Sequence, residues 1–290
     1  MEKITFIINP ISGHGKKKTV EKKIEKFLSQ DFNLEILYTN APKHATELSR
    51  KASEDSNIIV AVGGDGSIHE VGQALIDNES KLAIIPMGSG NGLARHLKIP
   101  LNIQKSIEII NQNYSQRIDV LDFGNLYGLN VSGIGFDAHI AHKFASHGKR
   151  GFLSYIKLTL NEYLKYKAQN YTLEINGVEM HTEAFLISLA NSSQFGNNAY
   201  IAPNAKIDDG FFDLTLLSPF RKRESLIIGL KLFTKKIDQS HQVKIIKTKE
   251  VKITSEKDFT LHIDGEDMGI KKELNVKIKP SALNIIVPEN

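Results

Sequence analysis

The chain has 290 residues, 41% of them hydrophobic and 24% charged, which indicates a globular protein with a sizeable core and favours two domains over one. It has no cysteine and no apolar run near the ~20 residues of a spanning helix, so we expect neither disulfides, thiolate metal sites, secretion nor membrane spanning. The net charge of +4 suits an anionic surface or a nucleotide as partner, although most lysines are expected to face solvent.

The first part of the chain alternates between apolar strands and amphipathic helices. Strands are predicted over 3–8, 33–39, 57–62 and 81–86, and helices over 16–30, 42–54, 67–77 and 92–97. Such alternation is typical of a doubly wound parallel sheet.

The pattern changes after about residue 117, where short and often alternating strands predominate. These are predicted over 117–123, 127–132, 171–175, 184–190, 212–217, 243–247, 250–254, 259–263 and 274–278. They predict an antiparallel β domain, interrupted by helices over 152–167 and 222–236. We therefore assign 1–120 to an α/β domain and 121–290 to a β-rich domain, with a last strand over 281–287 that could pair back on the first domain.

Three glycine-containing loops each follow a predicted strand of the first domain. They are Asn9-Pro10-Ile11-Ser12-Gly13, Gly63-Gly64-Asp65-Gly66-Ser67 and Gly88-Ser89-Gly90-Asn91. Glycine permits positive φ and leaves no Cβ in the way of a ligand, while the unpaired N–H groups that begin the next helix stabilise an anion. Three such loops together indicate a site for a nucleoside triphosphate.

Asp65 is an acidic residue inside the second of these loops. A carboxylate beside phosphate would repel it unless a divalent cation or a hydroxyl donor lay between them, so we interpret Asp65 as a ligand of magnesium or of an acceptor hydroxyl. The alternative is a tight turn in which Asp65 and Ser67 are capping residues.

Six motifs, in order and nearly from end to end, resemble the diacylglycerol kinase catalytic family of lipid kinases, which includes bacterial soluble lipid kinases and the sphingosine and ceramide kinases. They are Asn9-Pro10-x-Ser12-Gly13, Gly63-Gly64-Asp65-Gly66-Ser67-x-x-Glu70, Pro86-x-Gly88-Ser89-Gly90-Asn91, Gly133-Ile134-Gly135-Phe136-Asp137-Ala138, Ala202-Pro203-x-Ala205-Lys206-x-Asp208-Asp209-Gly210 and Asp264-Gly265-Glu266. The resemblance implies an N-terminal doubly wound parallel sheet like that of NAD kinase and phosphofructokinase, and a C-terminal antiparallel β-sandwich.

The resemblance also implies where ATP and its reaction partners lie. The implied ATP contacts are Asn9, Pro10, Ser12, Gly13, Thr39, Gly64, Asp65, Gly66, Ser67, Glu70, Gly88, Ser89, Gly90 and Asn91. Asp65 and Asp119 match acidic positions tied to magnesium and to the acceptor. Asp264 and Glu266 match the carboxylate pair that takes the proton from the lipid hydroxyl, with Asp264 our first choice as the base and Glu266 our second.

Two further sites follow from the resemblance alone. In bacterial members the carboxylate that matches Asp209, with the backbone carbonyls of the residues that match Lys206 and Phe211, holds a structural magnesium, and oxygen-only coordination suits such a hard cation. In sphingosine kinases the position of Asp137 meets the polar head of the acceptor. Local sequence leaves another interpretation open, because Asp208-Asp209-Gly210 and Asp264-Gly265-Glu266 are also typical of plain turns.

We therefore expect a kinase that uses ATP and Mg²⁺ to phosphorylate the hydroxyl of a long-chain lipid such as diacylglycerol or a sphingoid base. Gly92 stands where many bacterial members carry aspartate, which favours a sphingoid or ceramide-like acceptor. The alternatives are a NAD-kinase-like small-molecule kinase, against which the motifs at 133–138 and 206–210 argue, and a catalytically silent lipid- or nucleotide-binding protein. The expected partner is a lipid met transiently at a membrane surface from the cytoplasm, not nucleic acid, and a homodimer is left open.

Overall fold

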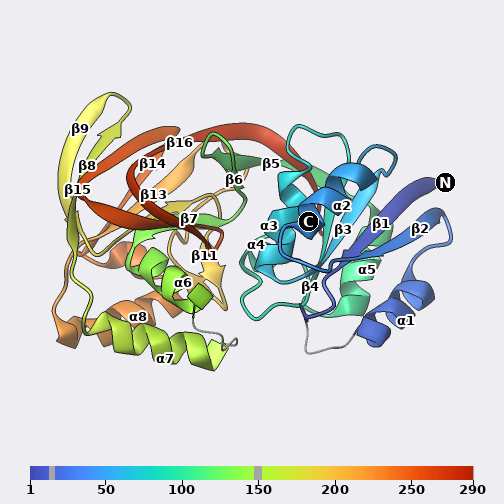
Figure 1. The fold of residues 1–290 in the computed structure, drawn as a ribbon, viewed down its shortest axis with the longest axis horizontal. Coiled ribbons are helices and arrows are strands. Elements are labelled where there is room, and N and C mark those ends of the chain that lie inside the picture. The colour runs from blue at the N-terminus through green and yellow to red at the C-terminus, as the bar shows by residue number, and fades with distance from the viewer. Residues whose placement is uncertain (13–16, 147–151, 290) are drawn as a thin grey trace. The chain divides into compact units, whose positions relative to one another are not determined.

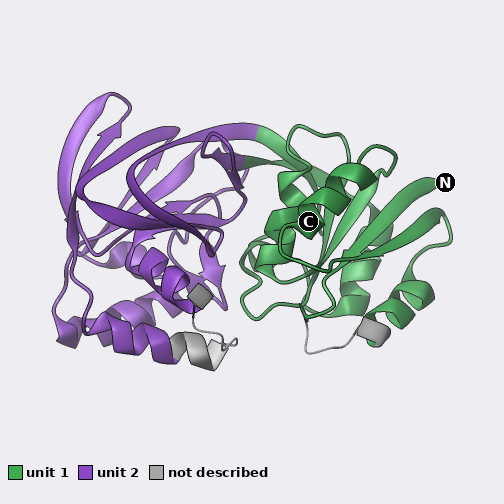
Figure 2. Ribbon diagram, in the orientation of Figure 1, with its two compact units in different colours: residues 1–119, 281–290 green, residues 120–280 purple. Residues whose placement is uncertain are grey.

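A computed structural model of the chain describes residues 1–12, 17–146 and 152–289. The chain forms two compact units (Figure 2). Unit 1 consists of Met1–Asp119 and Ser281–Asn290, and unit 2 of Val120–Pro280. The strands β5 (Ser115–Asp122) and β16 (Glu266–Ile286) each carry the chain from one unit into the other.

Unit 1 is built on a parallel sheet (Figure 1). Its strands are β1 (Glu2–Ile8), β2 (Phe32–Tyr38), β3 (Ile58–Gly63) and β4 (Lys81–Pro86), side by side in the order β2-β1-β3-β4. The end of β16 runs parallel to β4, with Ile285 opposite Leu82. Every residue of β3 is buried, because a central parallel strand is covered on both faces and so is apolar throughout.

Helices cover the two faces of this sheet. They are α1 (Lys17–Phe27), α2 (His44–Ala52), α3 (Asp65–Gln73), α4 (Gly92–His96) and α5 (Ile103–Gln112). Helices α1 and α5 pack on Ile4, Phe6 and Ile8 of β1. The alternate residues of the strands, such as Ile7 and Ile59, are buried as well, and α2 and α3 contact each other and the strands. The sheet is therefore doubly wound, as predicted.

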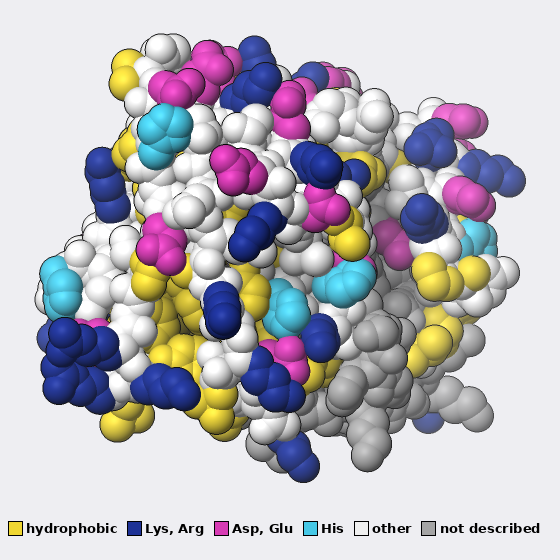
Figure 3. Space-filling model, turned by 60° about the vertical axis from the view of Figure 1, so that its left-hand side comes forward, with side chains coloured by type: hydrophobic (Ala, Val, Ile, Leu, Met, Phe, Trp, Pro, Cys, Tyr) yellow, Lys and Arg dark blue, Asp and Glu magenta, His cyan; other side chains and the backbone are white. Residues whose placement is uncertain are grey.

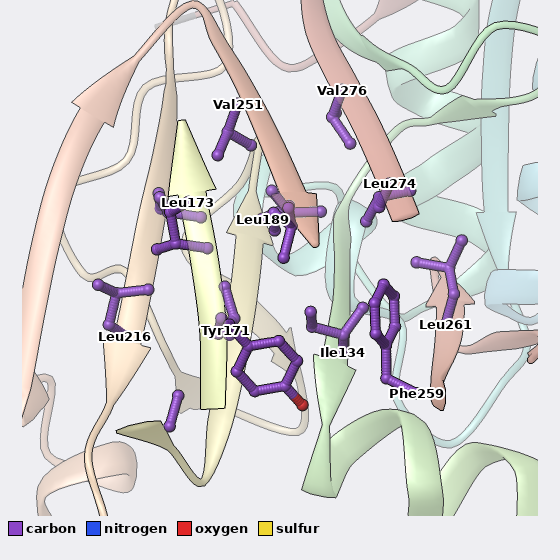
Figure 4. Packing of buried hydrophobic residues seen from close by; sticks show 14 of the residues in the cluster. Ile134, Tyr171, Leu173, Leu189, Leu216, Val251, Phe259, Leu261, Leu274 and Val276 are labelled. Atoms are coloured by element: carbon purple, nitrogen blue, oxygen red, sulfur yellow. The ribbon is translucent and has the colours of Figure 1, made fainter. Parts of the chain in front are cut away.

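Unit 2 is mainly antiparallel. Its strands are β6 (Tyr127–Gly128), β7 (Val131–Gly135), β8 (Gln169–Ile175), β9 (Val178–Ala184), β10 (Leu186–Ala190), β11 (Gln194–Gly196), β12 (Ala199–Tyr200), β13 (Phe212–Leu217), β14 (Val243–Thr248), β15 (Glu250–Ile263) and most of β16. They run in the order β14-β13-β10-β7-β15-β16, and β8 joins β9 to the far part of β15. Figure 4 shows the core that these strands enclose, around Leu173, Leu189 and Val251. The predicted antiparallel β-sandwich is confirmed.

Two predicted strand pairs prove to be single long strands. The segments 250–254 and 259–263 belong to β15, whose pairing with β16 shifts register between Thr254 and Phe259. The segments 274–278 and 281–287 likewise belong to β16. An irregularity of this kind bends a strand without ending it, which is why the apolar pattern is interrupted in the sequence.

Helices of unit 2 pack on a second apolar cluster, formed with β7 and β10. They are α6 (Phe136–Ser146), α7 (Phe152–Tyr163) and α8 (Ser225–Phe233), with short 3-10 turns η2 (Lys222–Glu224) and η3 (Ile237–Gln239) beside α8. Ile140, Leu158 and Ile228 bring the three helices into this cluster. No helix in the described ranges is long and apolar enough to cross a bilayer.

The start of α5, a helix that the sequence patterns above do not include, depends on one side chain. Asn102 accepts a hydrogen bond from the N–H of Lys105 at 3.3 Å. We predict that Asn102→Ala lowers the free energy of unfolding by about 1 kcal/mol, because the first turn loses its cap. Gln104→Ala, two residues further on, is the control and should change it little. Urea denaturation measures both, and equal effects would contradict the cap.

Candidate active site

The candidate nucleotide site lies at one edge of the sheet of unit 1. Because β1 to β4 are parallel, their carboxyl ends share this edge, where open α/β sheets bind ligands. Asn9 follows β1, Thr39 follows β2, and the loops 63–67 and 88–91 follow β3 and β4. The N–H of Thr39 donates to Ile8 O at 3.0 Å, which fixes it beside the start of the first loop. Gly13 lies outside the described residues.

Asn9 connects the first loop to the second. Its side-chain amide donates to Ser67 Oγ at 3.0 Å, and its carbonyl oxygen accepts from the N–H of Ile11 at 3.1 Å. Pro10 and Ser12 are half-buried in this loop, and the N–H of Ser12 donates to Asn9 O at 3.1 Å. The asparagine therefore shapes its own loop and holds it against the start of α3.

The second and third loops touch at two glycines. A Cβ on Gly88 would lie 2.6 Å from Gly64 Cα, and a Cβ on Gly64 would lie 3.1 Å from Gly88 Cα. Real Cβ atoms do not come this close to backbone, so both positions require glycine. Asn91 closes the third loop with two bonds to Gly88, one to its N–H at 2.9 Å and one to its carbonyl at 2.8 Å. The result is a direct backbone contact between the two loops at the N-terminus of α3.

Asp65, the first residue of α3, uses both carboxylate oxygens to hold the third loop. They accept hydrogen bonds from two consecutive backbone N–H groups, of Asn91 at 2.8 Å and Gly92 at 2.7 Å. Those groups belong to the start of α4, where N–H donors lack partners within the helix. Asp65 thus positions the loop, and its expected role as a ligand of magnesium or of an acceptor hydroxyl stays a prediction.

Of the other residues assigned to ATP, some are glycines or exposed residues of the loops, and Glu70 makes structural contacts. Gly66 lies in the first turn of α3, Ser89 is exposed in the third loop and Gly90 accepts from Arg95 Nε at 3.1 Å. Glu70 points to α2, because its carboxylate accepts from the N–H groups of Lys43 and Ala45 at 2.9 and 3.2 Å. Arg95 is a cation at this edge that the sequence did not single out.

Asp119 is a buried residue of β5, and its side chain contacts β16 within unit 1. Its Oδ1 accepts from the N–H of Ser281 at 2.8 Å, at a residue whose φ is +50°. A non-glycine residue in this left-handed region is strained and needs such support. Asp119 therefore makes a structural contact with the backbone of Ser281.

Asp264 of unit 2 repeats the arrangement of Asp65. Its carboxylate accepts from the N–H groups of Leu129 and Asn130, both at 2.8 Å, and the residue is 9% exposed. Its φ of +52° puts it at the first position of the turn that joins β15 to β16, followed by Gly265 at φ +88°. The hairpin turn foreseen from local sequence is present, and it presents a carboxylate fixed at both oxygens. Glu266, in contrast, is exposed, and its side chain has no hydrogen bond or ion pair within the described ranges.

Asp137, the residue assigned to the lipid head group, forms a buried pair with His262. His262 Nε2 lies 3.2 Å from Asp137 Oδ2, and His262 Nδ1 accepts from the N–H of Gly265 at 3.1 Å. Since Nδ1 accepts, the proton is on Nε2 and the ring donates it to the carboxylate. Gly133 lets the pair form, because a Cβ there would lie 2.6 Å from Asp137 Oδ2 and 3.3 Å from His262 Nε2. His262 thus connects Asp137 to the turn that carries Asp264.

Aromatic rings surround Asp137 on the α6 side. Phe136 lies 4.7 Å from Phe185 and 5.3 Å from Tyr166 between ring centroids. Burial, followed by the charge of Asp137, raises the pKa of Tyr166 to about 12. The Tyr171 hydroxyl is buried as well, and Figure 4 shows it on the side of Ile134. Asp137 therefore lies on a helix that packs against aromatic rings, and its side-chain partner there is His262.

His262 was not identified from the sequence. The only local signal was its position two residues before Asp264, inside an apolar strand. A single histidine in such a strand gives no indication of a partner 125 residues away.

The carboxylate assigned to a structural magnesium has a cationic partner in the structure, and the magnesium site itself stays a prediction. Asp209 Oδ2 lies 2.6 Å from Lys247 Nζ, and its Oδ1 accepts from the N–H of Phe211 at 3.1 Å. Burial works to lower the pKa of Lys247, but its bond to Asp209 and the charge of Asp213 outweigh burial and raise it. The ammonium already supplies the positive charge that a metal would bring. Lys206 is exposed, and within the described ranges no three His, Asp or Glu side chains could hold a metal.

A glycine-lined edge on a parallel α/β unit, joined to an antiparallel β-sandwich with buried acids, defines the class of two-domain kinases that phosphorylate a hydroxyl group. Residues 3–123 match the diacylglycerol kinase catalytic domain, and residues 130–287 match the YegS C-terminal NAD kinase beta sandwich-like domain. The chain belongs to the diacylglycerol kinase-like family of lipid kinases.

Relatives and solved structures agree with this assignment. A diacylglycerol kinase of Staphylococcus aureus strain RF122 is 28% identical over 273 residues, which cover 91% of this chain and 86% of that protein. An uncharacterized protein of Synechocystis is 27% identical over 98% of this chain and 70% of its own length. A crystal structure from Bacillus anthracis strain Sterne, provisionally assigned as a diacylglycerol kinase, is 26% identical with a TM-score of 0.83, covering 99% of this chain and 97% of that one.

The glycine contact between the second and third loops gives a direct test of the nucleotide site. Gly88→Ala should lower the free energy of unfolding by about 1–3 kcal/mol, because its Cβ would force the loops apart. It should also weaken ATP binding at least tenfold by calorimetry. Gly229→Ala is the matched control, since a Cβ there meets nothing within 4 Å and alanine favours the helix. Unchanged ATP affinity in Gly88→Ala would contradict the assignment.

The melting temperature tests both the role of Lys247 and the magnesium site expected from the sequence. The wild-type melting temperature should not respond to EDTA or to added Mg²⁺. Lys247→Met should melt a few degrees lower, since it leaves Asp209 and Asp213 without a cation, and Mg²⁺ should restore part of the loss. A wild-type protein that EDTA destabilises would instead support the magnesium site expected from the sequence.

Proposed function

We propose that this kinase transfers the γ-phosphate of ATP to the hydroxyl of a long-chain lipid such as diacylglycerol or a sphingoid base. The observation that carries the proposal is the close contact of the glycine loops at Gly64 and Gly88, with Gly64 at the N-cap of α3. A polyphosphate there would meet N–H donors and the positive end of a helix, and the two glycines add no side chain. The family assignment supports ATP as the donor.

Phosphoryl transfer requires positioning and charge stabilisation more than covalent help from the protein. Asp65 serves the first need, because its two bonds hold the third loop where Gly64 and Gly88 meet. Arg95 lies at the same edge as a fixed cation. Magnesium, which we propose accompanies the nucleotide, would supply further charge to the phosphate oxygens when bound.

The acceptor side is proposed to lie in unit 2, at Asp137. Its carboxylate is 11% exposed and pairs with His262, and it stands on α6 next to Phe136, which packs among aromatic rings. Such a group favours a ligand that brings a hydroxyl or an ammonium donor together with a hydrocarbon body. Diacylglycerol and sphingoid bases both meet this description.

We propose Asp264 as the acceptor of the hydroxyl proton. Its two backbone bonds fix the carboxylate in one orientation at a strained turn. For a loose transition state, position matters more than high basicity. Glu266 is exposed, and we assign it a secondary role in the same turn.

The decisive experiment is transfer of radiolabelled phosphate from Mg-ATP by the purified protein to diacylglycerol, sphingosine, ceramide, monoacylglycerol and NAD. We expect a labelled lipid and no labelled NAD. Labelled NAD would establish the small-molecule kinase instead, and no transfer to any acceptor would favour a silent binding protein.

The two acids of the turn should differ in a way that separates folding from chemistry. Asp264→Asn should abolish transfer and also cost about 1–3 kcal/mol of stability, since its amide group would face a backbone N–H. Glu266→Gln should leave stability unchanged and lower kcat by a smaller factor. Denaturation and kcat measured on the same preparations check both, and full activity in Asp264→Asn would exclude it as the base.

His262 should act as a positioning residue with a separable effect on KM and kcat. His262→Ala should raise the lipid KM and lower kcat, each about tenfold, because both Asp137 and the Gly265 turn lose a partner. His262→Gln can still donate to Asp137, so it should recover KM but not kcat. Equal kinetics for the two variants would show that the histidine is only a packing residue.

A further inference from the structure

Helix α8 exposes a stripe of large apolar side chains. Leu226 is 81% exposed, Leu230 63% and Phe233 54%, and their spacing of four and three residues puts them on one face. Ile227 next to them is also exposed. The opposite face is the buried one, where Ile228 and Leu232 pack on the cluster shared with α6 and α7. The exposed stripe is therefore additional to what the fold needs.

Basic side chains stand at both ends of this stripe. Residues 221–236 contain six basic residues and one acidic residue. Arg221, Lys222 and Arg223 precede α8 and are exposed, as are Lys235 and Lys236 after it. The one acid, Glu224, accepts from the N–H of Arg221 at 2.7 Å. Hydrophobic and basic side chains also lie next to one another on the face of the molecule in Figure 3.

Lys235 adds an observation of its own. The helix ends in a Schellman turn, in which the N–H of Lys236 donates to Lys231 O at 2.9 Å and Lys235 adopts φ +58°. Glycine is the residue that fits this position without strain. A lysine at this position places a positive charge at the end of the apolar stripe. It does so in a left-handed backbone conformation that is unfavourable for a residue with a side chain.

We infer that α8 and its flanking basic residues are a docking surface for an anionic lipid bilayer, an inference that rests on the proposed lipid kinase function. Apolar side chains flanked by cations match the interface of such a membrane, whose acyl boundary accepts the former and whose head groups attract the latter. A second copy of the chain fits less well, because a two-fold contact through this face would bring like charges together. Leu160 and Leu164, exposed near and beyond the end of α7, which packs on the same cluster, offer further apolar contact.

Sedimentation with vesicles tests the surface without nucleotide. The full chain should bind phosphatidylcholine vesicles that contain phosphatidylglycerol, bind pure phosphatidylcholine vesicles weakly, and dissociate as salt is raised. The double variant Leu226→Gln and Leu230→Gln should bind at least tenfold more weakly, since glutamine keeps the helix but removes the apolar contact. Val178→Gln with Ile270→Gln is the matched control, because these residues are 68% and 61% exposed elsewhere in unit 2.

The variant Lys235→Gly separates the effect of charge on vesicle affinity from any effect on stability. It should lower vesicle affinity about fivefold while stability stays the same or rises, because glycine relieves the left-handed residue. Equal vesicle binding by the wild type and the α8 double variant would overturn the inference. So would a failure of the wild type to bind anionic vesicles, or a dimer that the double variant abolishes.

Activity on a short-chain diacylglycerol dispersed in detergent keeps this inference distinct from the proposed function. The α8 variants should retain wild-type kcat there and lose activity only on vesicles. Vesicle binding without any phosphate transfer would leave the docking surface in place and reject the kinase proposal alone.

Discussion

Two carboxylates that each hold two consecutive backbone N–H groups organise the candidate active site. Asp65 joins the start of α3 to the start of α4, and Asp264 joins the β15–β16 turn to the segment before β7. Bonds of this kind are charge-assisted, and removal of the acceptor would leave donors unpaired. Each acid therefore fixes one loop of its own unit, and the residues that meet phosphate or lipid depend on those loops.

Close packing of glycine completes the arrangement in both units. Gly64 and Gly88 allow two loops to touch in unit 1, and Gly133 admits the Asp137–His262 pair in unit 2. In each case the glycine is needed because another group occupies the space of its Cβ. Glycines in the motifs that carry the family resemblance are thus sterically required where they stand.

The structure changes the interpretation of several acids without changing the class of protein. Asp209 pairs with Lys247 where a magnesium was expected, Glu70 caps α2, and Asp119 supports Ser281. Glu70 and Asp209 were assigned by their place in a motif, and Asp119 by its match to an acidic position of the family. Their hydrogen-bond partners come from other elements, so the motif alone could not show that each has a structural contact.

Sequence alone determined the parallel α/β unit, the antiparallel unit and the places of the three glycine-containing loops, because strand and helix periodicity and the conformational freedom of glycine are local properties. It did not reveal α5, the continuity of β15 and β16 or the role of His262. Only the tertiary structure decided which donors each acid accepts. Asp264 and its donors lie more than 130 residues apart, and His262 and Asp137 lie 125 apart. Contacts over such separations depend on sheet register and loop closure, which no short pattern of residues specifies.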